Sequence, residues 1–178
     1  MKVLSNEISD KNIIVHKDYS IPKQFLKFRP LCLFISYSGN TEETLSGISD
    51  AKKNNLDWIV ISSGGKLIDI AQNEGKEYIK IPSGLQPRAA FGYLTLAISR
   101  ILDIVEGSDY VSQLNEASSY LENLTEKAED SDINKLSLDI CESINKKTVI
   151  IYSGTNMSKV ISSRWKTQIN ENAKSKAF

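Results

Sequence analysis

A turn with the sequence SYSGNT, residues 36–41, is the segment of this chain whose residue types are best suited to binding an anion. Ser36, Ser38 and Thr41 supply hydroxyl groups, and Gly39 permits a positive φ and a close approach of the backbone to a ligand. The turn follows an apolar run and precedes a predicted helix, and ligands of open α/β sheets bind at such carboxyl ends of parallel strands.

The start of the predicted helix supports the same interpretation. Asn40 or Thr41 can cap this helix, which leaves backbone N–H groups that point at the turn. Those donors and the helix dipole favour a bound anion, so the turn predicts a phosphate site that needs no lysine. The alternative is an ordinary capped helix, in which Thr41, Glu42 and Glu43 serve only the cap and the dipole.

The composition argues against a general electrostatic partner. The 178 residues carry 22 Lys and Arg against 22 Asp and Glu, so neither nucleic acid nor an anionic membrane is an expected partner. One histidine and two distant cysteines, Cys32 and Cys141, make no usual metal site, and we expect reduced thiols. No apolar run approaches the roughly 20 residues of a membrane span, and the first residues lack the apolar stretch of a signal peptide, so we expect a cytoplasmic protein.

Apolar runs alternate with helical patterns along most of the chain. The short apolar or β-branched runs predict strands, and the segments between them show the residue spacing of helices. This order predicts an α/β fold with a parallel sheet and crossover helices. The predicted strands span residues 13–15, 31–35, 58–61, 78–81 and 149–152, and the predicted helices between them span 41–54, 66–73 and 88–105.

The sequence predicts two α/β domains joined by helices. Residues 1–107 form the first domain, residues 108–146 a helical connection, and residues 147–178 the start of a second α/β domain. The connection is polar and shows two amphipathic helices that meet around residues 130–132. The chain opens on a short polar helix with no first strand before it and stops just after a helix, so we expect the first domain to be incomplete and the second to be truncated.

Five strings of residues, in order along the chain, form a recognisable set. They are VHKDY (15–19), SYSGNTEET (36–44), SSGGKL (62–67), GLQPRAAFGY (84–93) and WKTQINENAK (165–174). Together they resemble the sugar-isomerase (SIS) family, and in particular its bifunctional phosphoglucose/phosphomannose isomerases. The resemblance implies a three-layer α/β/α parallel-sheet domain of flavodoxin-like type. It also implies interconversion of glucose 6-phosphate or mannose 6-phosphate with fructose 6-phosphate through a cis-enediolate, without a metal or an organic cofactor.

The resemblance assigns roles to residues as well. Glu171 matches the carboxylate base that moves a proton between C2 and C1, and Arg88 matches the arginine that steadies the enediolate. The matches to the phosphate-binding part are Ser36, Ser38, Gly39, Asn40 and Thr41. As alternatives, Glu171 is an ordinary exposed helix residue, and Arg88 packs or forms a salt bridge at a helix start. A cation just after Pro87 is poorly placed for the helix dipole, which mildly favours a functional role for Arg88.

Three parts of the family pattern have no counterpart in these 178 residues. They are the histidine of a Pro-Glu-x-x-His-type segment after the glutamate helix, a lysine near the family's C-terminus, and a glycine-serine loop after the first strand. The single histidine, His16, is expected to lie at the surface. We therefore expect a piece of an isomerase that is inactive alone and forms a homodimer at full length. A phosphosugar-binding module without catalysis is the alternative, and the preference between glucose and mannose phosphate stays open.

Overall fold

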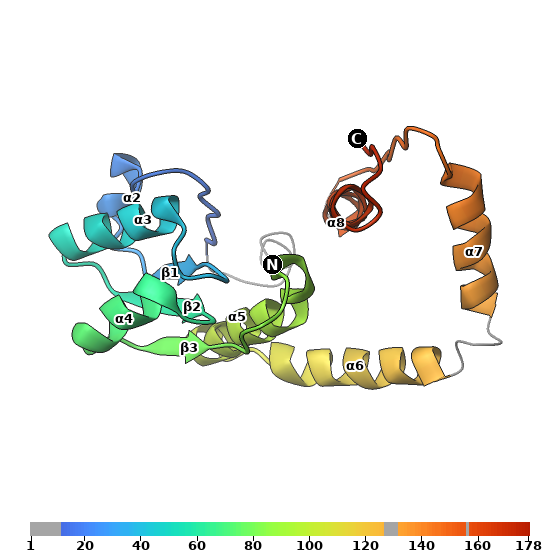
Figure 1. Ribbon diagram of the computed structural model, residues 1–178. Helices are drawn as coiled ribbons and strands as arrows, with labels where there is room; N and C mark the ends of the chain where they lie inside the picture. The colour runs from blue at the N-terminus through green and yellow to red at the C-terminus, as the bar shows by residue number, and fades with distance from the viewer. Residues whose placement is uncertain (1–11, 127–131, 156) are drawn as a thin grey trace. The chain divides into compact units, whose positions relative to one another are not determined.

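The structure of the chain, a computed structural model, describes residues 12–126, 132–155 and 157–178. The chain divides into two compact units. Figure 1 labels their helices and strands. Residues 14–108 form one of them, here termed the sheet unit, and the described residues between 109 and 178, with residues 12 and 13, form the other, termed the helical unit. The predicted domain boundaries, at residues 107 and 146, stay predictions.

Three parallel strands form the sheet, in the order β1-β2-β3. They are β1 (Cys32–Ile35), β2 (Trp58–Ser62) and β3 (Tyr78–Lys80). Phe34 lies beside Val60, and Val60 lies beside Tyr78. Strand β2 has a partner on each side, and its Val60 and Ile61 are fully buried, as a β-branched run in a central strand should be. These three predicted strands are confirmed.

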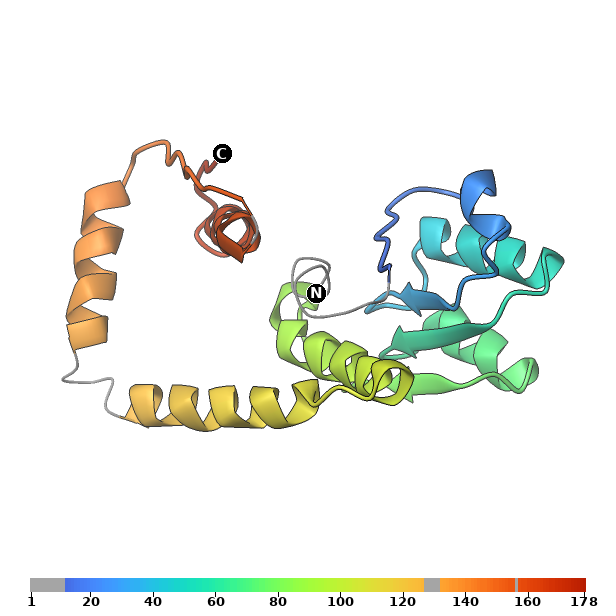
Figure 2. The same ribbon diagram turned by 180° about the vertical axis from the view of Figure 1, so that it is seen from behind.

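A helix follows each strand, as the sequence pattern predicts. These helices are α3 (Glu42–Lys53), α4 (Gly65–Asn73) and α5 (Phe91–Glu106). Figure 1 shows α4 in front of the sheet and α5 behind it, and Figure 2 shows the reverse. Right-handed crossovers between parallel strands place helices on the faces of the sheet in this way. The sheet unit therefore has the α/β/α layers that were predicted.

Two apolar clusters hold these layers together. On one face, α3 and α4 contribute Ile48, Ala51, Leu67, Ile68 and Ala71, which pack with Phe34, Trp58 and Val60 of the sheet. On the other face, Ala97 and Ile101 of α5 pack with Ile61 and Ile81, together with half-buried side chains of all three strands. Burial of this apolar surface is the main stabilising term for the unit.

The segment before β1 differs from its prediction. Residues 13–15 were expected to form a strand, but the structure shows an irregular segment with Ile14 and Val15 about half exposed. The prediction is wrong because a β-branched run becomes a strand only where it finds a partner strand. A short helix, α2 (Lys23–Leu26), lies between this segment and β1. The polar helix predicted at the start of the chain falls in residues 1–11, outside the described residues.

The helix predicted over residues 88–105 is interrupted. A short 3₁₀ helix, η1 (Pro87–Ala89), comes first, and α5 then begins at Phe91. Pro87 fixes its own φ and supplies no N–H group, which suits the first position of such a turn. Ala90, at φ −79° and ψ 6°, separates the two helices. The sequence periodicity does not reveal this break, because Ala89 and Ala90 fit a continuous helix equally well.

The helical unit contains α6 (Tyr110–Glu126), α7 (Asp132–Ile144) and α8 (Met157–Glu171). The two amphipathic helices predicted for this region are confirmed. Of their predicted junction around residues 130–132, residues 130 and 131 lie outside the described residues. The strand predicted over 149–152 appears only as a parallel bridge between Val149 and Ala177. Across the described ranges, no helix is long and apolar enough to cross a membrane.

Candidate functional site

Three loops meet at the carboxyl edge of the sheet. They span residues 36–41 after β1, 63–64 after β2, and 82–86 after β3. Because the three strands are parallel neighbours, their carboxyl ends lie at one edge, which is the usual ligand-binding edge of an open α/β sheet. The backbone joins the first two loops directly, since the N–H of Ser63 donates to the carbonyl of Tyr37 at 3.0 Å.

Two of the hydroxyl groups in the first loop, which is termed the phosphate turn after its predicted role, bond to each other. The Oγ atom of Ser36 lies 2.7 Å from Oγ1 of Thr41, and the backbone N–H of Gly39 donates to the same Ser36 oxygen at 3.2 Å. Ser36 is buried, whereas Ser38 and Thr41 are exposed. The Ser36 hydroxyl therefore closes the turn from within, and the other two hydroxyls lie at its surface.

Thr41 occupies the N-cap position of α3 without capping it through its side chain. Its hydroxyl instead pairs with Ser36, as the 2.7 Å distance shows. The first hydrogen bond of the helix runs from the N–H of Leu45 to the carbonyl of Thr41 at 3.0 Å. The N–H groups of residues 42–44 therefore come before the first i to i−4 hydrogen bond of α3. This arrangement lacks the Thr41 cap of the alternative interpretation, but Glu42 and Glu43 do lie in the first turn of α3, as that alternative assumed. The positive end of the helix dipole faces the turn.

Asn40 has a bracing role that its position in the turn did not suggest. Its side-chain carbonyl accepts a hydrogen bond from the N–H of Lys66 at 3.1 Å, and its NH₂ group donates to the carbonyl of Ser38 at 3.2 Å. Lys66 lies in the first turn of α4, so this amide ties the phosphate turn to the start of the next helix. The sequence prediction assigned Asn40 to phosphate binding, and these contacts show how its side chain shapes the turn.

Two glycines bring the first and second loops into backbone contact. Gly39, at φ +70°, has no room for a Cβ atom, which would lie 1.8 Å from the carbonyl oxygen of Gly64. Gly65, at φ +69°, is its counterpart, since a Cβ atom there would lie 2.4 Å from the carbonyl oxygen of Ser38. The sequence signalled Gly39 as a turn residue. The pairing with the SSGG string could not be predicted from either string alone.

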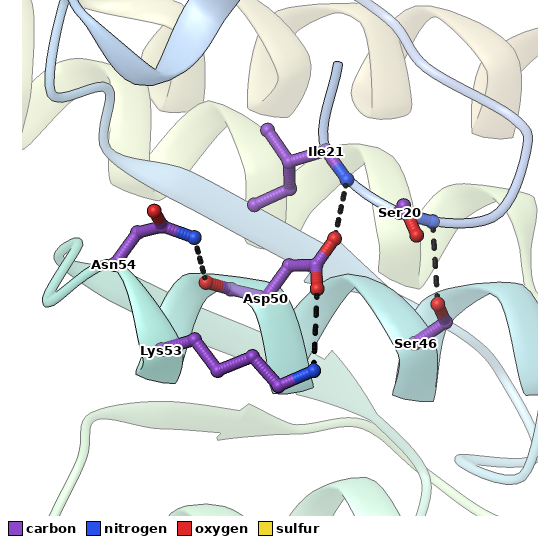
Figure 3. A network of polar contacts seen from close by, with 6 residues as sticks. All are labelled: Ser20, Ile21, Ser46, Asp50, Lys53 and Asn54. Carbon is purple, nitrogen blue, oxygen red and sulfur yellow. Dashed lines mark hydrogen bonds and ion pairs between the residues drawn. The ribbon is translucent and has the colours of Figure 1, made fainter. Parts of the chain in front are cut away.

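Polar side chains of α3 bind the segment that precedes β1. The N–H of Ser20 donates to the hydroxyl of Ser46 at 3.3 Å, and the N–H of Ile21 donates to the carboxylate of Asp50 at 3.2 Å (Figure 3). One turn nearer the phosphate turn, the hydroxyl of Tyr19 donates to Glu42 at 3.1 Å.

This contact with Glu42 changes the chemistry of the Tyr19 phenol. The hydrogen bond to Glu42, followed by the negative charge of that carboxylate, raises the pKa of Tyr19 above its ordinary value. Residues 42, 46 and 50 are spaced four apart, so they form one polar stripe along α3.

The two residues predicted to act on the sugar lie in different units. Arg88 is half-buried in η1, at the end of the third loop of the sheet unit. Glu171 is the last residue of α8 in the helical unit, and its side chain is exposed. The structure thus places Arg88 on the loop edge that carries the phosphate turn and describes Glu171 with the other unit.

The two cysteines and the histidine belong to none of the three loops. Cys32 and Cys141 are free thiols, and burial raises the pKa of the half-buried Cys32. His16 is exposed, as expected, and its Nε2 atom lies 3.4 Å from the carbonyl of Tyr19. Within the described parts of the chain, no group of three or more His, Cys, Asp or Glu side chains could hold a metal ion.

Comparison with known proteins gives a consistent set of relatives. Residues 133–178 match the family model described as the bacterial phospho-glucose isomerase C-terminal SIS domain. A bifunctional phosphoglucose/phosphomannose isomerase of Caldicellulosiruptor bescii is 40% identical over 171 residues, which cover 93% of this chain and 50% of that protein. A protein of the same name from Aquifex aeolicus is 37% identical over 177 residues, with 99% and 52% covered.

A third relative carries a different name. It is a D-glucosamine-6-phosphate 4-epimerase of Sulfolobus acidocaldarius, 37% identical over 145 residues, which cover 81% of this chain and 44% of that protein. The chain therefore spans about half the length of the curated relatives that it matches.

Proposed function

We propose that this chain, which belongs to the sugar-isomerase (SIS) family, takes part in the isomerisation of phosphorylated hexoses. The reaction is the interconversion of glucose 6-phosphate or mannose 6-phosphate with fructose 6-phosphate. Its support is the phosphate turn at residues 36–41, together with relatives whose names state both activities. The sheet unit binds the phosphate group and so holds the sugar in place.

The phosphate turn is suited to this task because it offers several donors without a bulk positive charge. The exposed hydroxyls of Ser38 and Thr41 and the first N–H groups of α3 are the proposed ligands, and Gly39 lets the backbone approach closely. Each hydrogen bond to a charged group contributes about 1.5–3 kcal/mol. A few of them are enough for a usable site in a protein with no net charge.

The chemical step needs a base and a group that stabilises negative charge. A base removes the C2 proton of the open-chain aldose and returns it to C1, and negative charge develops on the sugar oxygen in between. We assign the base to Glu171 and the stabilising cation to Arg88, as the family resemblance indicates. A positioned general base contributes about 10²–10⁴-fold to such a reaction. The chemistry requires neither a metal nor an organic cofactor.

A coupled assay tests this function. Fructose 6-phosphate turnover is measured for this chain, for a version extended to the length of the relatives, and for extended Glu171→Gln and Glu116→Gln variants. Glu116 is an exposed residue of α6 and serves as the control. We expect turnover by the extended protein and by Glu116→Gln, a loss of at least about 100-fold in Glu171→Gln, and little turnover by the 178-residue chain. Comparable turnover by Glu171→Gln would contradict the assignment of the base.

The relative named as a 4-epimerase defines the second candidate function. Both reactions act on a hexose 6-phosphate, and the phosphate turn serves either of them. The same extended protein, incubated with glucosamine 6-phosphate, separates the two, because an epimerase inverts C4 and leaves the aldose group unchanged. Epimerised product without fructose 6-phosphate turnover would favour the second function over the first.

We also propose that the full-length enzyme is a cytoplasmic homodimer. Several large apolar side chains of α5 are exposed in the sheet unit, among them Phe91, Leu96 and Ile104, and such side chains are commonly covered by a partner subunit. Sedimentation of the extended protein should show a dimer. A monomer at high concentration would contradict this part of the proposal.

A further inference from the structure

Tyr37 connects all three loops at the carboxyl edge of the sheet. It lies between Ser36 and Ser38 in the phosphate turn. Its backbone carbonyl accepts hydrogen bonds from the second loop, from the N–H of Ser63 at 3.0 Å and from the Ser63 hydroxyl at 2.6 Å. Its side chain reaches the third loop. The family resemblance assigns no role to this side chain.

The phenol of Tyr37 closes the third loop. Its hydroxyl accepts a hydrogen bond from the N–H of Leu85 at 2.8 Å and donates to the carbonyl of Pro82 at 3.2 Å. In a closed four-residue turn, these two backbone groups would pair with each other. Here both bond to the same hydroxyl, so the side chain of Tyr37 sets the shape of residues 82–85.

Arg88 lies three residues beyond Leu85, on a stiff connection. Pro87 fixes φ, the N–H of Ala89 donates to the carbonyl of Gln86 at 2.8 Å, and Ala90 leads directly into α5. Because Pro87 and the 3₁₀ turn restrict the backbone of this connection, the position of Leu85 determines the position of the Arg88 backbone.

The ring of Tyr37 is held separately from its hydroxyl. It packs against the apolar cluster around Ile61 and Ile81, between the sheet and α5. A Tyr37→Phe substitution therefore removes the two hydrogen bonds and keeps the packing, which makes it a clean test.

We propose that Tyr37 is a positioning residue that fixes the loop carrying Arg88 relative to the phosphate turn. This inference rests on the proposed isomerase function. It predicts that the Tyr37 hydroxyl affects the rate of the chemical step through Arg88, while the phosphate turn keeps its affinity for the substrate. A misplacement of about 1 Å can lower an enzyme's rate by on the order of 100-fold.

Kinetics of the extended protein test whether the Tyr37 hydroxyl acts through Arg88. Tyr37→Phe should lower kcat by about tenfold or more and change KM by less than about threefold. In an Arg88→Ala background, the same Tyr37→Phe change should have little further effect on kcat, because the group that it positions is gone. Tyr78→Phe is the matched control, since the hydroxyl of Tyr78 accepts a hydrogen bond from Gln72 at 3.1 Å at the start of β3. Additive effects of the Tyr37 and Arg88 substitutions would overturn the proposal.

Amide hydrogen exchange on the 178-residue chain gives a second test that does not depend on catalysis. The Leu85 N–H should exchange at least about tenfold faster in Tyr37→Phe and at the parent rate in Tyr78→Phe. An unchanged Leu85 rate in Tyr37→Phe would overturn the proposal. A parent enzyme without isomerase turnover would contradict only the proposed function, and the exchange result would then decide whether Tyr37 holds the loop.

Discussion

Residues of the phosphate turn divide into those that shape the turn and those that face outward. Ser36, Gly39 and Asn40 make contacts inside the loops, whereas Ser38 and Thr41 present exposed hydroxyls. All five were predicted from the sequence as one phosphate-binding set. Their types could be recognised, but the division could not, because it depends on partners such as Lys66 that lie 26 residues away in the chain.

A substitution at Gly39 should be among the most damaging in the sheet unit. A Gly39→Ala side chain would stand 1.8 Å from the Gly64 carbonyl at a positive φ, so we expect a loss of about 3 kcal/mol or more in the free energy of unfolding. Gly92→Ala is the control, because a Cβ atom there meets nothing within 4 Å and the residue lies in α5. That control should stay within about 1 kcal/mol of the parent. Urea denaturation measures both, and equal stabilities would contradict the close packing of the two loops.

Tyr19 offers a prediction on pH dependence. The hydrogen bond to Glu42 raises the Tyr19 pKa in the folded chain, so the neutral phenol is favoured by folding. Its stabilising effect is present below the ordinary tyrosine pKa and is lost as the pH rises through the raised folded value. NMR of labelled tyrosines should show Tyr19 titrating at a lower pH in Glu42→Gln than in the parent. Glu77→Gln, on the loop before β3, should leave the titration unchanged, and an unshifted Glu42→Gln curve would refute the bond.

Helices and strands were predicted correctly where a local sequence pattern has a neighbouring element that buries its apolar side chains. Strands β1 to β3 and helices α3 and α4 form where the periodicity placed them, because each run finds a neighbour that buries it. The predictions failed where the partner could not be read from the sequence. Residues 13–15 have a strand composition without a paired strand, and residues 149–152 form only a bridge, with Ala177 as the partner of Val149.

The polar stripe on α3 is the element-scale feature whose strength is simplest to measure. Asp50→Ala removes the acceptor for the Ile21 N–H, so we expect a loss of about 1–2 kcal/mol in the free energy of unfolding. Lys53→Ala separates this hydrogen bond from the ion pair of Asp50 with Lys53, whose charged atoms lie 3.9 Å apart (Figure 3). This exposed pair should contribute less than about 0.5 kcal/mol. A larger loss in the free energy of unfolding from Lys53→Ala than from Asp50→Ala would show that the ion pair, and not the hydrogen bond to Ile21, is the main stabilising contact.

At the scale of the whole molecule, the sequence predicts the sheet unit better than the relation between the two units. The resemblance to the SIS family could be recognised from five short strings, and the α/β class from the alternation of apolar runs and helical patterns. The relation between Arg88 and Glu171 could not be predicted, because the two residues belong to separate units. The chain covers about half of its relatives, so the activity of the complete enzyme remains a proposal.

Isothermal titration of fructose 6-phosphate into the 178-residue chain is the most direct test of phosphate binding over the start of α3. The parent should bind fructose 6-phosphate but not fructose, and a Ser38→Ala, Thr41→Ala double variant should bind at least about tenfold more weakly, since it loses two hydroxyl donors. A Thr125→Ala, Ser137→Ala double variant controls for the loss of hydroxyls, because both of these bond to helix carbonyls in the helical unit. Unchanged affinity in the Ser38, Thr41 variant, or equal binding of fructose by the parent, would contradict the assignment of this turn as the phosphate site.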